Sequence, residues 1–144
     1  MQKTLVIFSI VAAAALSMLG YGYIKATPDP GGLTGSFPAI EIIPEFFDFG
    51  EVAYGEVAKH IFVLKNTGSQ PLELKRISTS CACTTAKATV ETILPGQQTK
   101  LTVSYDTGAM SGPHGKGDQE RIIYIQSNDP MKPQIEAIIH ARVN

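Results

Sequence analysis

The sequence predicts an all-β sandwich of about seven strands, preceded by one hydrophobic N-terminal helix. From residue 39 onward the apolar residues recur with a period of two, and no stretch of a dozen residues shows the period of an amphipathic helix. Turn-forming residues separate the extended segments at short intervals. An uncharged apolar run comes before these segments, and it is the source of the predicted helix.

Residues 1–25 are expected to be an export signal or a membrane anchor. Lys3 precedes the apolar run from Leu5 to Leu19, and no charge follows until Lys25. About 20 uncharged residues are enough to span a bilayer, and the positive start with a shorter apolar centre also fits a signal peptide. Gly20 and Gly22 would suit cleavage, whereas tyrosines before Lys25 suit a retained anchor at the membrane surface. A third alternative is a buried core helix of a soluble protein. The position of the apolar run at the extreme start of the chain argues against this alternative.

Either the anchor or the signal would place the rest of the chain outside the cytoplasm. The chain would then be membrane-anchored with a periplasmic domain, or exported after signal cleavage. Residues 26–38 contain three prolines and three glycines, a composition that cannot form regular structure, and we expect a flexible linker there. The folded domain is expected over residues 39–144.

Within this domain the strands are assigned from alternating apolar and polar residues and from the turn residues between them. The alternation in Leu101, Val103 and Tyr105 predicts that these side chains face the core. The expected turns are 66–69, 94–97, 108–117 and 127–130. The expected strands are 41–43 with 46–49, 57–65, 72–78, a short one near 85–89, 99–105, 121–126 and 134–143.

Six ordered blocks along this domain carry a resemblance to a known family. The blocks are Phe46-Phe47-Asp48-Phe49-Gly50-Glu51-Val52, Phe62-Val63-Leu64-Lys65-Asn66-Thr67-Gly68, Ser80-Cys81-Ala82-Cys83-Thr84-Thr85, Leu94-Pro95-Gly96, Val103-Ser104-Tyr105-Asp106-Thr107 and Ser127-Asn128-Asp129-Pro130. Together they resemble the bacterial family "domain of unknown function 1573" from Phe46 to the end of the chain. One departure is Ala82, where the family commonly carries glycine between its cysteines.

The resemblance implies an immunoglobulin-like antiparallel sandwich, similar to domains of the major-sperm-protein and cilium-associated type. It also implies export or tethering to a membrane, and it implies no enzyme activity. We expect no cofactor. The implied fold agrees with the strand pattern, which alone predicts only a sandwich of short strands.

Cys81 and Cys83 are the residues with the most distinctive chemistry. Two thiolates at this spacing can bind one soft metal ion, but a third or fourth ligand would have to come from His60, His114, His140, Met110 or Met131. Met110 and His114 lie in the glycine-rich segment 108–117 and would complete such a site if that segment folds beside the cysteines. Alternatively, a disulfide between cysteines one residue apart closes a tight ring that is easy to reduce, which suits thiol exchange. In the third interpretation both cysteines are small packing residues where one strand ends and the next begins.

Other functional classes are poorly supported by the sequence. Twelve basic residues against 13 acidic ones leave no basic surface for nucleic acid. No serine lies in a nucleophile-elbow pattern, and we expect neither catalytic residues nor a small-molecule substrate. The leading hypothesis is therefore a non-catalytic, extracytoplasmic and membrane-tethered binding or assembly module for a protein or cell-envelope partner. The alternative is a metal-binding or thiol-redox protein that uses Cys81 and Cys83.

Overall fold

The computed structural model describes residues 36–110 and 115–144, and the regular structure there consists of strands. The predicted N-terminal helix and most of the predicted linker lie outside these residues. Within them, no helix is long and apolar enough to cross a membrane. The strands are β1 (Ile40–Ile43), β2 (Phe46–Val52), β3 (Val57–Asn66), β4 (Leu72–Thr79), β5 (Thr84–Ala88), β6 (Thr92–Ile93), β7 (Gln98–Asp106), β8 (Gly117–Ser127) and β9 (Gln134–Val143).

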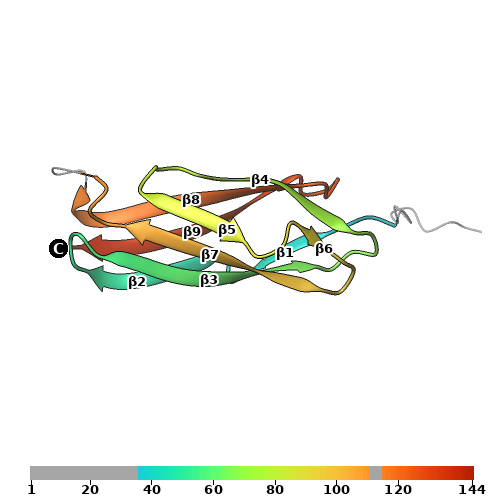
Figure 1. Cartoon of the computed structure of the whole chain (residues 1–144), viewed down its shortest axis with the longest axis horizontal. Helices are drawn as coiled ribbons and strands as arrows, with labels where there is room; N and C mark the ends of the chain where they lie inside the picture. The colour runs from blue at the N-terminus through green and yellow to red at the C-terminus, as the bar shows by residue number, and fades with distance from the viewer. Residues whose placement is uncertain (1–35, 111–114) are drawn as a thin grey trace, which may run out of the picture. The chain divides into compact units, whose positions relative to one another are not determined.

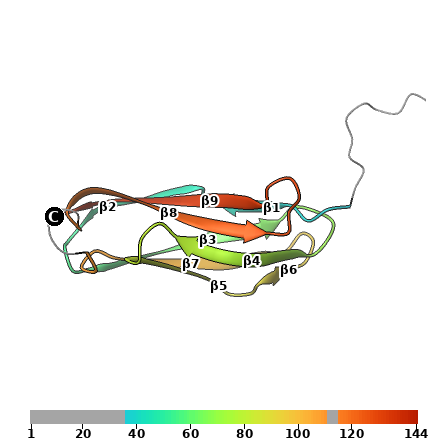
Figure 2. The ribbon, with the colours of Figure 1, turned by 90° about the horizontal axis from the view of Figure 1, so that it is seen from above.

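The strands form two sheets, and this arrangement confirms the predicted sandwich. One sheet has the order β1-β3-β7-β5, and the other has the order β2-β9-β8-β4-β6. Figure 1 shows the strands running along the domain, and Figure 2 shows β8 and β9 lying over β5 and β7. The chain changes sheets between β1 and β2, and β4 and β5 likewise belong to different sheets.

Two details of the predicted topology are wrong. The sheets are not wholly antiparallel, because β2 pairs with β9 in parallel. The described residues also hold nine strands rather than about seven, because the segment 41–49 divides into β1 and β2 and because β6 adds a two-residue strand. A pair of residues is too short to show any alternation, so β6 could not be found from the pattern.

The strand β8 starts at Gly117 and not at the predicted Arg121. Its first four residues are Gly117, Asp118, Gln119 and Glu120, and they pair with the end of β9. Polar residues such as these show no apolar alternation, and strand pairing with β9 extends the element instead.

The core lies between the sheets and consists of side chains from alternate strand positions. Leu101, Val103 and Tyr105 are at most 2% exposed, as the alternation predicts. On β3 the inward residues Phe62 and Leu64 are fully buried, whereas Ile61, which precedes Phe62, is half exposed on the outer face. Burying a large apolar side chain contributes roughly 1.5–3 kcal/mol, so these inward positions stabilise the pairing of the two layers.

Candidate functional site

The two cysteines lie in the turn that connects β4 in one sheet with β5 in the other. They form a disulfide with a Cα–Cα distance of 5.1 Å. The hydroxyl of Thr79 donates to the main-chain oxygens of Cys81 and Thr84 at 3.0 and 2.9 Å, which holds the turn closed. The main-chain N–H of Cys83 lies 3.0 Å from the Cys81 sulfur. The local backbone therefore fixes both sulfur atoms at one end of the sandwich.

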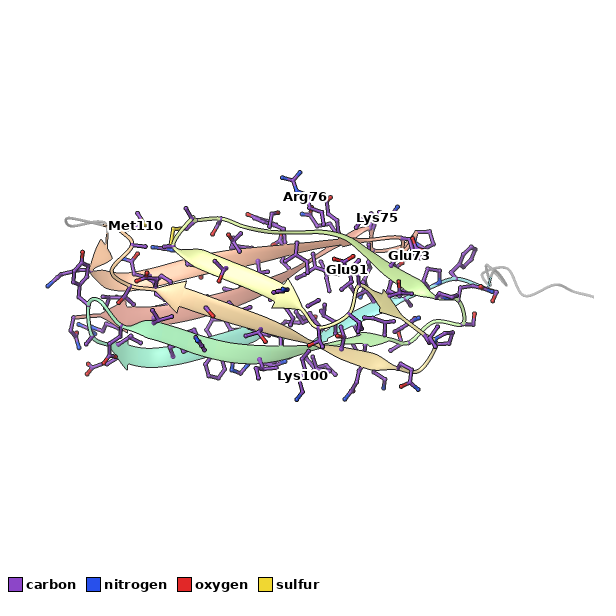
Figure 3. All side chains as sticks on the ribbon, viewed as in Figure 1. Glu73, Lys75, Arg76, Glu91, Lys100 and Met110 are labelled. Carbon is purple, nitrogen blue, oxygen red and sulfur yellow. A yellow bond between two sulfur atoms is a disulfide. The ribbon has the colours of Figure 1, made fainter. Side chains whose placement is uncertain are left out.

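The segment after β7 and the strand β8 bring two further side chains to the disulfide. The Met110 sulfur lies 3.4 Å from the sulfur of Cys81. The Arg121 Nε group donates to the sulfur of Cys83 at 3.2 Å, and Arg121 Nη2 lies 3.7 Å from the Met110 sulfur. In Figure 3 the labelled Met110 lies beside the yellow disulfide bond. The site is therefore a cluster of three sulfur atoms and one guanidinium group, which we call the sulfur–arginine cluster.

Arg121 is held in place by neutral partners. Its Nη2 donates to Gln119 Oε1 at 2.6 Å and its Nη1 donates to the Glu120 main-chain oxygen at 2.7 Å. Its guanidinium carbon lies 5.5 Å from the centre of the Tyr105 ring, and burial raises the pKa of that tyrosine. Among residues 36–110 and 115–144, no carboxylate lies within 4.0 Å of the guanidinium. Its positive charge is therefore not balanced by an ion pair in this part of the chain.

Arg121 was not predicted as a site residue, although the alternation along its strand indicates an inward position. Ile123 and Ile125 are fully buried, and Arg121 precedes them on the same face of β8 because side chains alternate along a strand. An arginine at a core-facing position requires hydrogen-bond partners, and the sulfur of Cys83 is one of them.

The predicted metal ligands are brought together only in part. Met110 does reach the cysteines, whereas His114 lies outside the described residues. The described residues contain no group of three His, Cys, Asp or Glu side chains that could hold a metal ion. A fixed guanidinium beside two of the sulfur atoms disfavours a cation there, because like charges repel. The arrangement thus favours chemistry in which negative charge develops on sulfur.

The remaining histidines are occupied elsewhere. The ring of His60 stacks on Phe47 at a centroid distance of 3.5 Å and meets Phe62 edge-on. Its buried Nε2 atom has no hydrogen-bond partner among the described residues, and burial lowers the pKa of the imidazole. His140 Nδ1 lies 3.1 Å from Asp48 Oδ1 on adjacent strands. Both are therefore strand histidines with structural contacts.

A second candidate site is the opening between the sheets at the edges of β4 and β5, which we call the β4–β5 groove. Only Leu72 and Glu73 of β4 pair with β6, and β5 pairs with β7 alone. Apart from that pairing and the hydrogen bond from the Leu74 N–H to the Glu91 main-chain oxygen, the edge of β4 that faces β5 and the outer edge of β5 have no partner strand within the described residues. A cavity of about 280 Å³ lies between them, lined by Leu74, Lys75, Arg76, Ile77, Ala86, Lys87, Ala88 and Glu91.

The β4–β5 groove has an apolar floor and a mainly basic rim. Ile77, Ala86 and Ala88 are half-buried and pack against the core. Lys75, Arg76 and Lys87 are exposed, and Figure 3 shows the labelled side chains of Lys75 and Arg76 on β4 at this edge. Glu91 is the one acidic residue of the lining. Within the described chain, none of these four charged residues forms an ion pair.

The model of one protein family, described as "Protein of unknown function (DUF1573)", matches residues 40–143. This match confirms the resemblance that the six sequence blocks carry, and it begins at the first residue of β1. No curated protein sequence matches this chain closely enough to count as a relative.

Solved structures with a similar fold include three informative examples. A protein of unknown function from Porphyromonas gingivalis W83 has 27% identity and a TM-score of 0.67, with 79% of this chain and 51% of that chain covered. The present chain thus spans about half the length of that protein. The ASH/PapD-like domain 7 of human CEP192 has 12% identity and a TM-score of 0.57, with coverages of 82% and 93%. The YadV chaperone has 14% identity and a TM-score of 0.55, with coverages of 73% and 52%. At these identities the last two show a shared PapD-like or immunoglobulin-like fold.

Proposed function

Because the chain belongs to the family described as "Protein of unknown function (DUF1573)", whose name assigns no activity, we propose a function from its geometry: a non-catalytic module that binds another protein. The ligand in this proposal is an extended, acidic segment that enters the β4–β5 groove. The observation that carries the proposal is the coincidence of two strand edges that are unpaired among residues 36–110 and 115–144, a cavity between them and a basic rim.

The two strand edges supply affinity without requiring a particular sequence. An extended segment that adds to a sheet edge satisfies main-chain donors and acceptors along its whole length. Alternate side chains of such a segment point to opposite sides. One set would enter the cavity over Ile77, Ala86 and Ala88, where small and medium apolar side chains have room.

The rim determines which segments are favoured. Three basic side chains and one acidic one surround the opening, so carboxylates on the second face of the segment would meet a net positive charge. Complementary charge raises association rates and disfavours basic competitors. The fold shared with the YadV chaperone is compatible with a protein-binding role.

The proposal includes display of this module outside the cytoplasmic membrane, with a protein of the cell envelope as its partner. It is supported by the charge-free run from Leu5 to Leu19 and by the proline- and glycine-rich segment that follows. A disulfide such as Cys81–Cys83 is also the state expected in an oxidising compartment. Mass spectrometry of the mature N-terminus, together with protease accessibility in spheroplasts, tests this part. Full protection of residues 39–144 from external protease would contradict it.

The binding proposal is tested with the full-length chain in detergent and two short synthetic peptides. One peptide alternates valine with aspartate, and the other alternates valine with lysine. We expect the acidic peptide to slow amide hydrogen exchange in residues 75–79 and 84–88, because a new strand there would protect main-chain N–H groups. The basic peptide should have little effect.

Charge reversal provides the matched comparison. Arg76→Glu at the rim should weaken binding of the acidic peptide about tenfold, which corresponds to about 1.4 kcal/mol. Lys100→Glu makes the same kind of change on the exposed face of β7, outside the cavity lining, and should leave binding within about twofold. Equal effects of the two substitutions, or no protection of either edge at peptide concentrations of about a millimolar, would refute the proposed groove.

A further inference from the structure

The two sulfur atoms of the disulfide differ in their access to solvent. Cys83 is 3% exposed and belongs to the hydrophobic core, whereas Cys81 is only partly buried. An external thiolate attacks one sulfur of a disulfide and expels the other, and access decides which sulfur is attacked. Attack is therefore directed to Cys81, and Cys83 becomes the leaving group.

The leaving sulfur is the one that contacts the guanidinium. Arg121 Nε already donates to the Cys83 sulfur at 3.2 Å, and no carboxylate among the described residues competes for that charge. A negative charge that develops on Cys83 would be stabilised by a hydrogen bond from a cationic donor. This donor is in place before the reaction, so little reorganisation is required.

We propose that Cys81–Cys83 is an exchange-active disulfide that accepts electrons from a dithiol of a partner protein, with Arg121 as the residue that stabilises the departing Cys83 sulfur. This inference does not depend on peptide binding in the β4–β5 groove. It assigns a further activity to the sulfur–arginine cluster, and it gives Arg121 a role beyond packing.

The exchange proceeds in two balanced steps. A thiolate of the partner attacks the Cys81 sulfur, the Cys81–Cys83 bond breaks, and its electron pair leaves on the Cys83 sulfur beside Arg121. The second thiolate of the partner then attacks the partner sulfur that is bonded to Cys81 in the mixed disulfide. The new bond joins the two partner sulfurs, and Cys81 leaves as a thiolate. The partner dithiol is oxidised to a disulfide, the cysteine pair is reduced, and the two thiol protons of the partner pass to solvent or to the released cysteines.

The first test follows reduction of the full-length folded chain by dithiothreitol, with maleimide trapping and mass spectrometry. Arg121→Gln should slow reduction roughly tenfold, which corresponds to about 1.4 kcal/mol in the activation free energy, because the departing sulfur loses a charged hydrogen bond. Arg121→Lys, which keeps the charge, should restore part of the rate. Arg142→Gln removes an exposed arginine from the neighbouring strand and should stay within about twofold of the parent rate. Equal rates for all four proteins would overturn the proposal.

The second test identifies the attacked sulfur and does not depend on an arginine variant that folds. The oxidised parent chain is treated with reduced glutathione and mapped after acid quenching, and the mixed disulfide should lie on Cys81. A predominance of the adduct on Cys83 would overturn the proposed direction. A disulfide that dithiothreitol reduces only under unfolding conditions would show that the bond is purely structural, and this result would also overturn the proposal.

Discussion

The buried side chain of Asn66 is predicted to be one of the main determinants of stability. It is fully buried at the end of β3. Its amide nitrogen donates to the main-chain oxygens of Gln70 and Ile93 at 2.8 and 2.9 Å. Its side-chain oxygen accepts from the main-chain N–H groups of Gly68 and Ala39 at 3.0 and 3.3 Å. One side chain therefore connects the β3–β4 turn with the residues next to β1 and with β6.

The expected loss follows from these four contacts. A hydrogen bond contributes about 1 kcal/mol net, and each buried partner left unsatisfied costs more. Asn66→Ala should thus lower the free energy of unfolding by about 4 kcal/mol, a large part of the roughly 5–15 kcal/mol typical of a domain. Asn66→Asp should be worse at neutral pH, because an oxygen then faces the two acceptor oxygens of Gln70 and Ile93 and a charge is buried.

The assay is urea denaturation of the full-length protein followed by circular dichroism, at neutral pH and at about pH 4.5. Burial should raise the pKa of the introduced carboxyl, so Asn66→Asp should recover stability at the lower pH, relative to Asn66→Ala. Asn144→Asp, a change at an exposed position, serves as the control. A loss below about 1 kcal/mol for Asn66→Ala, or an Asn66→Asp variant without recovery in acid, would refute this account of the network.

Three further predictions concern buried or crowded positions. Asp129 is 3% exposed; burial raises the pKa of its carboxyl, but hydrogen bonds from the main-chain N–H groups of Ile40, Lys132 and Met131 outweigh this effect and lower it. The ionised Asp129 carboxylate should contribute fully to the free energy of unfolding above about pH 3.8, and this contribution should be lost as the pH falls through the lower folded-state pKa. Asp129→Asn should lower the free energy of unfolding by about 2 kcal/mol in urea titrations near pH 7. For His60 the folded-state pKa is lowered by burial, so the unfolded state binds the proton first and stability should fall as the pH decreases from about 6.5 through that pKa. His60→Phe should reduce this acid-side loss in thermal melts between pH 7 and 5, and an unchanged pH dependence would contradict the assignment. Gly68→Ala should lower the melting temperature, because the added Cβ would meet the main chain of Phe37, Pro38 and Ala39. The free energy of unfolding should fall by about 1–3 kcal/mol. An unchanged melting temperature would show that the segment 37–39 can move away from the added Cβ.

Most of the strands could be predicted because their patterns are local. Residues 134–143 were assigned from alternation and coincide with β9, and the assignments for β3 and β4 end within one residue of the observed strands. The parallel pairing of β2 with β9 could not be predicted in the same way, because the two partners are separated by most of the domain and the pairing leaves no trace in either segment. The two-residue β6 likewise exists only because β4 lies beside it.

The candidate site was predicted only in part, for a related reason. The cysteines were identified by their chemistry, and Met110 was named as a neighbour if the glycine-rich segment folded beside them. Met110 itself does lie beside Cys81. Arg121 and the groove between β4 and β5 were not found. Both arise where strands of different sheets come together, and spacing along the chain does not encode which side chains meet across two layers.

The sequence by itself determined the alternation of inward and outward side chains, the positions of most turns and the presence of a Cys-x-Cys pair. These properties depend on neighbouring residues and on the two-residue period of an extended chain. Only the tertiary structure decided that Arg121 contacts Cys83, that Asn66 is a buried connector and that, in the part of the chain that the structure describes, no strand covers the facing edges of β4 and β5. Each of these depends on which strands become neighbours, and that is set by the packing of the two sheets over a common core.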